Sequence, residues 1–398
     1  MKITRTPTIA SNIWKLYVIQ ALTQALFMIP IIVLFWQSHG LNLKQIMLLQ
    51  SGFALTIFLL EIPTGYLADR WGRRNTLVLG CCFGVAAFVT YATGETFWRF
   101  LLAEILIGTG ASLLSGTIEA MTYDTLLELG REREYRKIAG NQAFFEFNTE
   151  AISGILGGLL GAISLVLPLW LTAIPMALAV CTAASLEEPK RQKLQESKHF
   201  KAIVHASSHA LFRHPGLRKV ILTYGLIASL SLMFFWFFQP YQTLIGVPVA
   251  LFGITHAVTV VAGACAAKSV SWFEKRSDDR LLLIIPALIT IICFLSLSLP
   301  PAPLLLIFFL VSRLSWHFVG PLSADLINRM TSSDVRATVL SVRSFFSRLL
   351  FVCVSPFVGA LADARGIPYA LFITGIVGGI ALLFAFVSMR SAWKEIPA

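Results

Sequence analysis

Long apolar segments follow one another along the whole chain, and they constrain its fold more than any other feature. A helix that crosses the hydrocarbon core of a membrane needs about 20 predominantly apolar residues. Backbone groups in lipid must be hydrogen-bonded within their own segment, so such runs predict a bundle of membrane-spanning helices. We predict twelve spans, at 12–36, 45–68, 75–94, 97–126, 138–162, 163–186, 218–243, 247–272, 281–299, 302–329, 337–362 and 368–390.

The composition excludes a soluble globule. Hydrophobic residues make up 56% of the 398 positions and charged residues only 13%, about half the share found in soluble domains. The 30 phenylalanines and 9 tryptophans have too little polar surface around them to be enclosed in a water-soluble fold. The 6 cysteines all lie inside apolar runs without a CxxC pair, so we do not expect them to bind a metal. We expect no cofactor.

Basic residues predict the orientation of the bundle. With both termini in the cytoplasm, about 26 of the 32 lysines and arginines fall on the cytoplasmic side, as the positive-inside rule requires. This distribution accounts for the net charge of +11 without a nucleic-acid partner.

One long hydrophilic stretch divides the spans into two sets of six. We predict an N-terminal six-helix bundle at 1–186, a cytoplasmic linker at 187–217 and a C-terminal six-helix bundle at 218–398. The linker contains an amphipathic segment from His199 to His214, which is typical of a short helix on the membrane surface. Four histidines about one helical turn apart, at 199, 205, 209 and 214, leave a metal-binding or pH-sensing role open.

The loop between the second and third spans is dense in charge and in turn-forming residues. It reads Gly65-Tyr-Leu67-Ala-Asp69-Arg70-Trp-Gly72-Arg73-Arg74. Glycines permit close helix approach and a tight turn, and an aspartate at a helix end can meet arginines or the positive N-terminus of another helix.

This loop resembles the signature G-x-L-x-D-R-x-G-R-R/K of the major facilitator superfamily and matches it at every fixed position. With the six-plus-six arrangement, the resemblance covers the whole chain and implies that superfamily's all-helical fold of two pseudo-symmetric bundles. It implies a conformational latch in which Asp69 contacts the start of the eleventh span and Asp124 or Glu128 engages the arginines. A loop that only anchors the topology is the alternative. The latch residues would be Gly65, Asp69, Arg70, Gly72, Arg73, Arg74 and Asp124.

Other segments are similar to a bacterial subset of the same superfamily. They are 115–124 with 130–135 in the first half, and 336–341 with 359–363 in the second. The resemblance implies a multi-pass protein of the bacterial inner membrane. Two positions depart from superfamily patterns: Glu104 stands where the fourth-span motif has arginine, and 153–158 lacks the proline of the antiporter motif.

Ionisable residues inside the predicted spans point to a structural or functional role, because placing each one at the membrane centre costs about 2.5–3.5 kcal/mol of insertion free energy. Acids occur in the first half and bases in the second, which indicates a cavity between the halves. Three roles stay open: salt bridges that hold one conformation, proton coupling, and substrate binding. The proton-coupling candidates are Glu61, Glu104, Glu119, Glu146 and Glu150. The substrate-cavity candidates are Gln20, Gln24, Gln239, Gln242, Arg313, His317 and Arg348.

Two further expectations concern the second half. The aromatic cluster at 234–241 is expected to face lipid or to form an interfacial belt. Arg343, two turns inside the eleventh span, is expected to extend its guanidinium to the membrane surface.

Together these features predict a monomeric secondary transporter that moves a small molecule by alternating access. We expect proton-coupled efflux of an amphipathic compound or metabolite. The alternative is proton-coupled uptake of an anionic or zwitterionic solute bound by Arg313 or Arg348, and a non-transporting lipid scramblase or sensor is the remote alternative. No Walker motif, Ser/His/Asp set or HExxH occurs, so we do not expect an enzyme.

Overall fold

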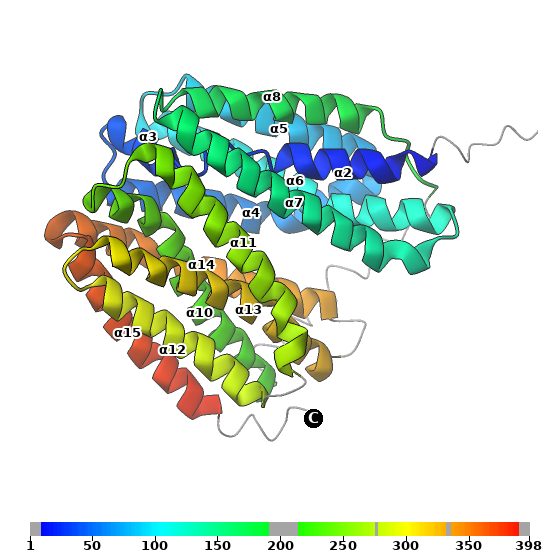
Figure 1. Cartoon of the computed structure of the whole chain (residues 1–398). Coiled ribbons are helices and arrows are strands. Elements are labelled where there is room, and N and C mark those ends of the chain that lie inside the picture. Colours follow the sequence, from blue (N-terminus) through cyan, green and yellow to red (C-terminus); the bar gives the residue numbers. More distant parts are fainter. Residues whose placement is uncertain (1–8, 191–213, 275–277, 332–335, 390–398) are drawn as a thin grey trace, which may run out of the picture. The chain divides into compact units, whose positions relative to one another are not determined.

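Helices make up all the regular structure in the residues described. The computed structural model describes residues 9–190, 214–274, 278–331 and 336–389, and Figure 1 shows the helices in chain order. Ten of the described helices are long and apolar enough to cross a membrane. The all-helical membrane fold is confirmed, whereas the count of twelve spans stays a prediction.

Eleven of the predicted spans each coincide with one helix. These helices are α4 (Leu43–Trp71), α5 (Arg73–Ala92), α6 (Phe97–Glu128), α7 (Tyr135–Gly161), α8 (Leu167–Ala184), α10 (Pro215–Leu244), α11 (Val249–Glu274), α12 (Asp279–Leu297), α13 (Leu306–Met330), α14 (Arg336–Arg365) and α15 (Ile367–Met389).

The first predicted span, 12–36, is instead two short helices, α2 (Asn12–Thr23) and α3 (Ile32–Ser38). The connection between them packs directly on α7, since a Cβ atom added to Gly157 would overlap the carbonyl of Phe27. Non-helical backbone at membrane depth is tolerated where it is buried in protein or lines a cavity. The prediction of one continuous helix is wrong here because an apolar run does not reveal a break that a neighbouring helix stabilises.

Contacts divide the chain into two compact units. Unit 1 contains Met1–Leu41, Gly52–Leu194 and Pro248–Val260, and unit 2 contains Asn42–Ser51, Gln195–Val247 and Val261–Ala398. In unit 1, α5 packs on α6 and α8, and α2 packs on α7 and α8. In unit 2, α10 packs on α12, α13, α14 and α15. Helices α4 and α11 each belong partly to one unit and partly to the other.

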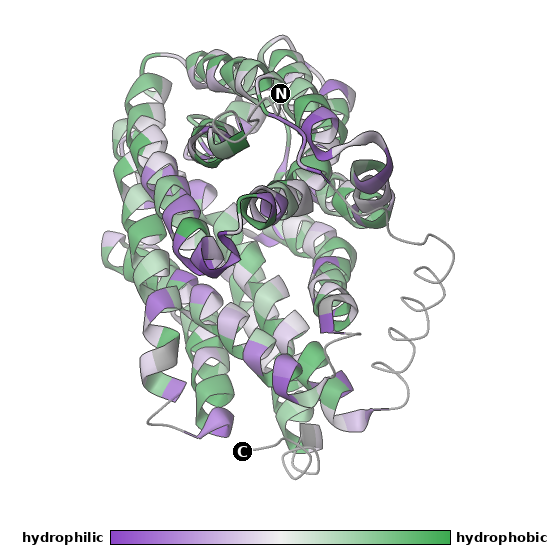
Figure 2. Cartoon of the chain, turned by 90° about the vertical axis from the view of Figure 1, so that its right-hand side faces the viewer, coloured by the Kyte–Doolittle hydropathy of each residue, from purple (hydrophilic) through white to green (hydrophobic). Residues whose placement is uncertain are grey.

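Most residues of the helices are hydrophobic (Figure 2). Large apolar residues are widely exposed, among them Ile163, Leu304 and Phe384, which are 78%, 82% and 76% exposed. Extended apolar surface of this kind suits contact with lipid rather than water.

The aromatic cluster of α10 lies inside unit 2. Phe234, Trp236, Phe238 and Tyr241 are each 9% exposed or less. Because α10 contacts four other helices, its aromatic side chains fill the interior between them. The expectation that they face lipid or an interface is therefore wrong.

The linker histidines at 199, 205 and 209 lie outside the described residues. His214 is described, and its Nδ1 accepts the N–H of Leu217 at 3.2 Å, so this side chain caps the start of α10.

Candidate functional site

The charged loop turns sharply at Gly72, between α4 and α5. Gly72 has φ 111°, a conformation that L side chains rarely adopt. The N–H groups of Arg73 and Arg74 then donate to the two carboxylate oxygens of Glu188, at 2.9 and 2.8 Å. A carboxylate at a helix N-terminus satisfies unpaired N–H groups and interacts favourably with the helix dipole. The loop is thus held by a residue 115 positions later in the chain.

The side chain of Arg73 points to α6. Its Nη1 lies 2.9 Å from Oδ2 of Asp124, and the two side chains are 14% and 15% exposed. Of the two acids that the sequence offers as partners for the arginines, Asp124 thus contacts the loop. Glu128 accepts the backbone N–H of Lys190 at 2.7 Å.

The last residue of α8 and the segment 185–190 that follows it join several helices at this end of unit 1. The Ser185 carbonyl accepts from Nζ of Lys15 in α2 at 2.6 Å. The side chain of Asn12 exchanges two hydrogen bonds with the backbone of Glu187, at 2.8 and 3.0 Å.

Glu188 is absent from the residues that the sequence singles out. The available signal is an acidic pair followed by proline immediately after an apolar span.

The remaining latch candidates lie near the end of α4. Arg70 donates to the Tyr66 hydroxyl at 3.3 Å, and Gly65 and Asp69 are exposed. The expected partner of Asp69, the start of α14, belongs to unit 2, so that contact stays a prediction. Glu61 is also exposed on α4.

A second copy of the G-x-L-A-D pattern occurs at Gly359–Asp363 in α14. Within unit 2, the Asp363 carboxylate accepts the N–H groups of Leu43 and Lys44, both at 2.9 Å. A Cβ atom on Gly359 would lie 2.7 Å from the Leu43 carbonyl oxygen, so glycine permits this approach. The end of α14 therefore caps the start of α4.

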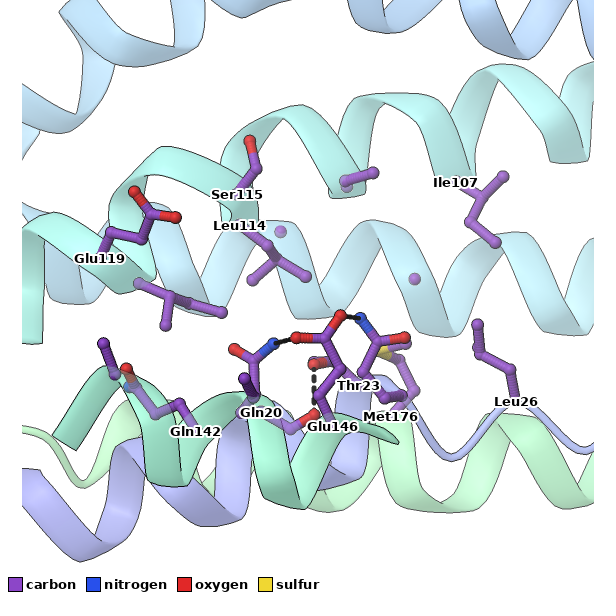
Figure 3. A pocket seen from close by; sticks show the side chains of 18 of the residues that line it. Gln20, Thr23, Leu26, Ile107, Leu114, Ser115, Glu119, Gln142, Glu146 and Met176 are labelled. Atoms are coloured by element: carbon purple, nitrogen blue, oxygen red, sulfur yellow. Dashed lines mark hydrogen bonds between the residues drawn. The ribbon is translucent and has the colours of Figure 1, made fainter. Parts of the chain in front are cut away.

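A pocket of about 510 Å³ lies within unit 1, a size typical of small-molecule sites. Residues of α2, α4, α5, α6, α7 and α8 line it, and Figure 3 shows many of them. Its polar lining residues are Gln20, Thr23, Gln24, Ser115, Glu119, Tyr135, Gln142 and Glu146. Its larger apolar lining residues include Leu26, Phe53, Phe88, Ile107, Leu114 and Met176.

Glu146 lies at the centre of this lining and is held by two amides. Nε2 of Gln20 donates to one carboxylate oxygen at 3.0 Å, and Nε2 of Gln24 donates to the other at 3.3 Å (Figure 3). Glu119 also lines the pocket and interacts electrostatically with Glu146. The fold therefore brings together four candidates that the sequence places on three separate spans.

Glu150 lies one turn beyond Glu146 and interacts electrostatically with it. Its Oε1 is 3.5 Å from Nε2 of His256 in the part of α11 that belongs to unit 1. A Cβ atom on Gly154 would lie 2.8 Å from the His256 ring, so the two helices approach closely here. His256 is 3% exposed, and sequence gives no signal for it beyond one histidine in an apolar run.

Glu104 takes a different place in α6. It is 4% exposed, interacts with the fully buried Tyr91 and is not among the residues that line the pocket.

The candidates of the second half lie in unit 2. Arg313 places its guanidinium 5.2 Å from the Phe235 ring and 5.7 Å from the Trp316 ring. Gln239 and Gln242 are 4% and 0% exposed. The remaining two candidates are His317, which packs against Gly263, and the half-buried Arg348.

Arg343 points into unit 2. Its Nη1 donates to the Gly320 carbonyl at 2.8 Å and to the Ser323 hydroxyl at 2.7 Å, and its guanidinium lies 4.4 Å from the Tyr224 ring. The expectation that Arg343 extends to the membrane surface is wrong, because Nη1 of its guanidinium finds both of these partners within unit 2.

Known proteins resemble this chain in sequence and in fold. The class H tetracycline resistance protein of Pasteurella multocida is 26% identical over 227 residues, which are 54% of this chain and 54% of that protein. The class C protein of Escherichia coli is 28% identical over 216 residues, 52% of this chain and 53% of that protein. The match thus spans about half the length of these relatives.

Among solved structures, a mutant of the nucleoside transporter NupG superposes with a TM-score of 0.84 at 14% identity, covering 95% of this chain and 99% of that one. A family model described as Major Facilitator Superfamily matches residues 13–352. The resemblance read from the charged loop is confirmed. The chain belongs to the Major Facilitator Superfamily and is a multi-pass membrane protein.

Proposed function

We propose that this protein is a proton-coupled exporter of a small amphipathic compound that works by alternating access. In this mechanism two helical bundles rock around a substrate site near the middle of the membrane. The observation that carries the proposal is the pocket in unit 1. There, a carboxylate inside the membrane-spanning region, Glu146, faces a space large enough for a small molecule and is oriented by Gln20 and Gln24.

Proton coupling is supported by the acids in and beside the pocket. A carboxylate can take up a proton in one conformation and release it in another when its surroundings change. Glu119 and Glu146 line the pocket, and Glu150 connects Glu146 to His256. Glu61 and Glu104 remain candidates, but neither lines this pocket.

Export is supported by the two relatives, whose names describe tetracycline resistance. We also propose that residues 1–186 and 218–398 form the two halves that move, joined by 187–217. We place both termini in the cytoplasm, the chain in a bacterial inner membrane, and the transporter as a monomer with no nucleic-acid partner.

The test is proton movement in proteoliposomes that contain a pH-sensitive dye. Pooled metabolites and amphipathic cations are added under an imposed pH gradient, with protein-free liposomes as the control. We expect substrate-dependent proton movement opposite to the movement of substrate. Movement in the same direction would support uptake of an anionic or zwitterionic solute by Arg313 or Arg348 instead. Substrate counterflow without proton movement would contradict the proposed proton coupling. The absence of any solute flux would favour a lipid scramblase or sensor.

A further inference from the structure

The pocket of unit 1 has a polar end and an apolar end. Figure 3 shows Glu119 and Gln142 at one end, Gln20 and Glu146 in the middle, and Leu26 and Ile107 at the other end. A ligand that matches this lining has a polar or charged head and an apolar body.

The two carboxylates of the lining differ in their partners. Glu146 accepts a hydrogen bond on each oxygen from a glutamine amide. Glu119 is exposed to the cavity and, within the described part of the chain, makes no hydrogen bond or ion pair with protein groups. Glu119 is therefore the carboxylate whose oxygens are available to a ligand.

The charge of the pocket is not balanced by its own lining. Among the described lining residues there are two glutamates and no lysine, arginine or histidine. The bases at the start of α7, Arg136 and Lys137, are not lining residues. Enclosing an ionised carboxylate against an apolar body without a counter-charge is unfavourable. A cation removes that penalty, whereas an anion adds like-charge repulsion.

We propose that the transported ligand is an amphipathic organic cation and that Glu119 is the residue that selects its charge. The cationic head contacts the Glu119 carboxylate, and the apolar body extends toward Phe88, Ile107 and Met176. Glu146, held by its two amides, stays available to exchange a proton. This inference rests on the proposed function, because it assigns the substrate class of the same pocket.

The experiment measures binding of tetraphenylphosphonium to the purified full-length protein, with tetraphenylborate as an anion of the same size and shape. We expect wild-type protein to bind the cation and to show at least tenfold weaker binding of the anion. Glu119→Gln should weaken cation binding at least about tenfold, which corresponds to about 1.4 kcal/mol. Glu119→Asp should stay within about threefold of wild type, because the charge is kept.

The matched control is Glu95→Gln, since Glu95 is an exposed glutamate outside the pocket. It should bind the cation like wild type, and size-exclusion profiles should show that every variant is folded. The proposal is overturned if wild type does not bind tetraphenylphosphonium, if it binds the borate as tightly, or if Glu119→Gln leaves the affinity unchanged.

The same variants separate this inference from the proposed function. Glu119-dependent binding without proton movement on adding the cation would keep the charge assignment and remove proton coupling. Proton-coupled export that proceeds at the wild-type rate in Glu119→Gln would keep the proposed function and remove the charge assignment.

Discussion

Two backbone N–H groups at the start of α5 depend on one carboxylate, that of Glu188. Replacing it with alanine leaves both donors without this acceptor. We expect Glu188→Ala to lower the free energy of unfolding by about 0.5–2 kcal/mol, the usual effect of losing an N-terminal cap. Thermal unfolding of the purified protein followed by intrinsic fluorescence measures this. Glu187→Ala is the matched control, because Glu187 meets Asn12 through its backbone; equal losses in the two variants would contradict the cap.

The two acids of α7 should differ in their effect on proton coupling. Glu150→Gln removes the carboxylate that faces His256, a side chain that can titrate. Glu146→Gln leaves an amide that can still bond the amides of Gln20 and Gln24. We expect Glu150→Gln to uncouple transport from the pH gradient more strongly than Glu146→Gln. Gradient-driven accumulation compared with counterflow in proteoliposomes measures this, and intact coupling in both variants would remove these acids from the proton path.

At the scale of single residues, the sequence identifies polar residues within the spans but not the residues that they contact. Gln20, Gln24, Glu119 and Glu146 could be chosen because polar side chains in apolar spans are costly to place in lipid. Glu188 and His256 could not, because each acts through a partner on a distant segment. Local pattern carries no information about which helices meet.

Helix ends, rather than helix interiors, carry the two G-x-L-A-D segments. The Asp363 carboxylate demonstrably caps α4, and we expect Asp69 to act in the same way on another helix start during the cycle. Asp69→Asn should therefore slow transport severalfold while the unfolding temperature stays near wild type, because Asp69 is exposed and a helix dipole favours a negative charge. Substrate counterflow provides the measurement, and a wild-type flux in this variant would refute the latch.

The turn between α6 and α7 contains a bidentate ion pair, with Nε and Nη2 of Arg131 at 2.7 and 2.8 Å from the two carboxylate oxygens of Glu134. Hydrogen bonding from Arg131 lowers the pKa of Glu134 below its usual 4.5. The pair therefore stabilises the turn above the unfolded-state pKa, and this contribution is lost as the pH falls through the folded pKa.

An NMR titration of the Glu134 carboxyl carbon tests the pair directly. We expect a midpoint below 4.5 that rises in Arg131→Gln. The same midpoint in both proteins would show that the pair does not form in solution.

Element boundaries were largely predictable, because apolar length sets the extent of a membrane helix. The break between α2 and α3 was not, because it depends on the close approach of Gly157 in α7. The sequence places the aromatic face of α10 against lipid for a similar reason: hydrophobic residues look alike in sequence whether they meet lipid or protein.

At the scale of the whole molecule, the contact between the start of α4 and α14 offers a test of the transport cycle. Asp363 of α14 accepts the N–H of Leu43 in α4, and Oγ of Ser51 in α4 lies 3.4 Å from Oγ of Ser355 in α14. Alternating access requires contacts of this kind to open and close. We expect a disulfide between Ser51→Cys and Ser355→Cys, in a background without the native cysteines, to reduce transport at least about tenfold. Reducing agent should restore the flux and each single variant should be unaffected; wild-type flux in the oxidised protein would mean that this contact stays closed throughout the cycle.

The fold of the whole molecule could be predicted from two features of the sequence, the apolar spans and the charged loop at 65–74. Both predictions agree with the family match over residues 13–352. The pocket within unit 1 did not follow from the sequence, which predicts a cavity between the halves; that second cavity stays a prediction. Spans are properties of local sequence, whereas a cavity is the space that packed helices leave unfilled.

The fastening of one end of unit 1 by residues 184–190 has a consequence for the order of synthesis. Asn12 lies 175 positions before its partner Glu187. At ribosomal rates of about 5–20 residues per second, that interval lasts roughly 9–35 s. Helices α2, α5 and α6 are synthesised within this interval. Until it ends, the Asn12 side chain at the start of α2 and the N–H groups at the start of α5 lack the acceptors that Glu187 and Glu188 later supply. The nascent first half therefore closes this end only when its last few residues emerge.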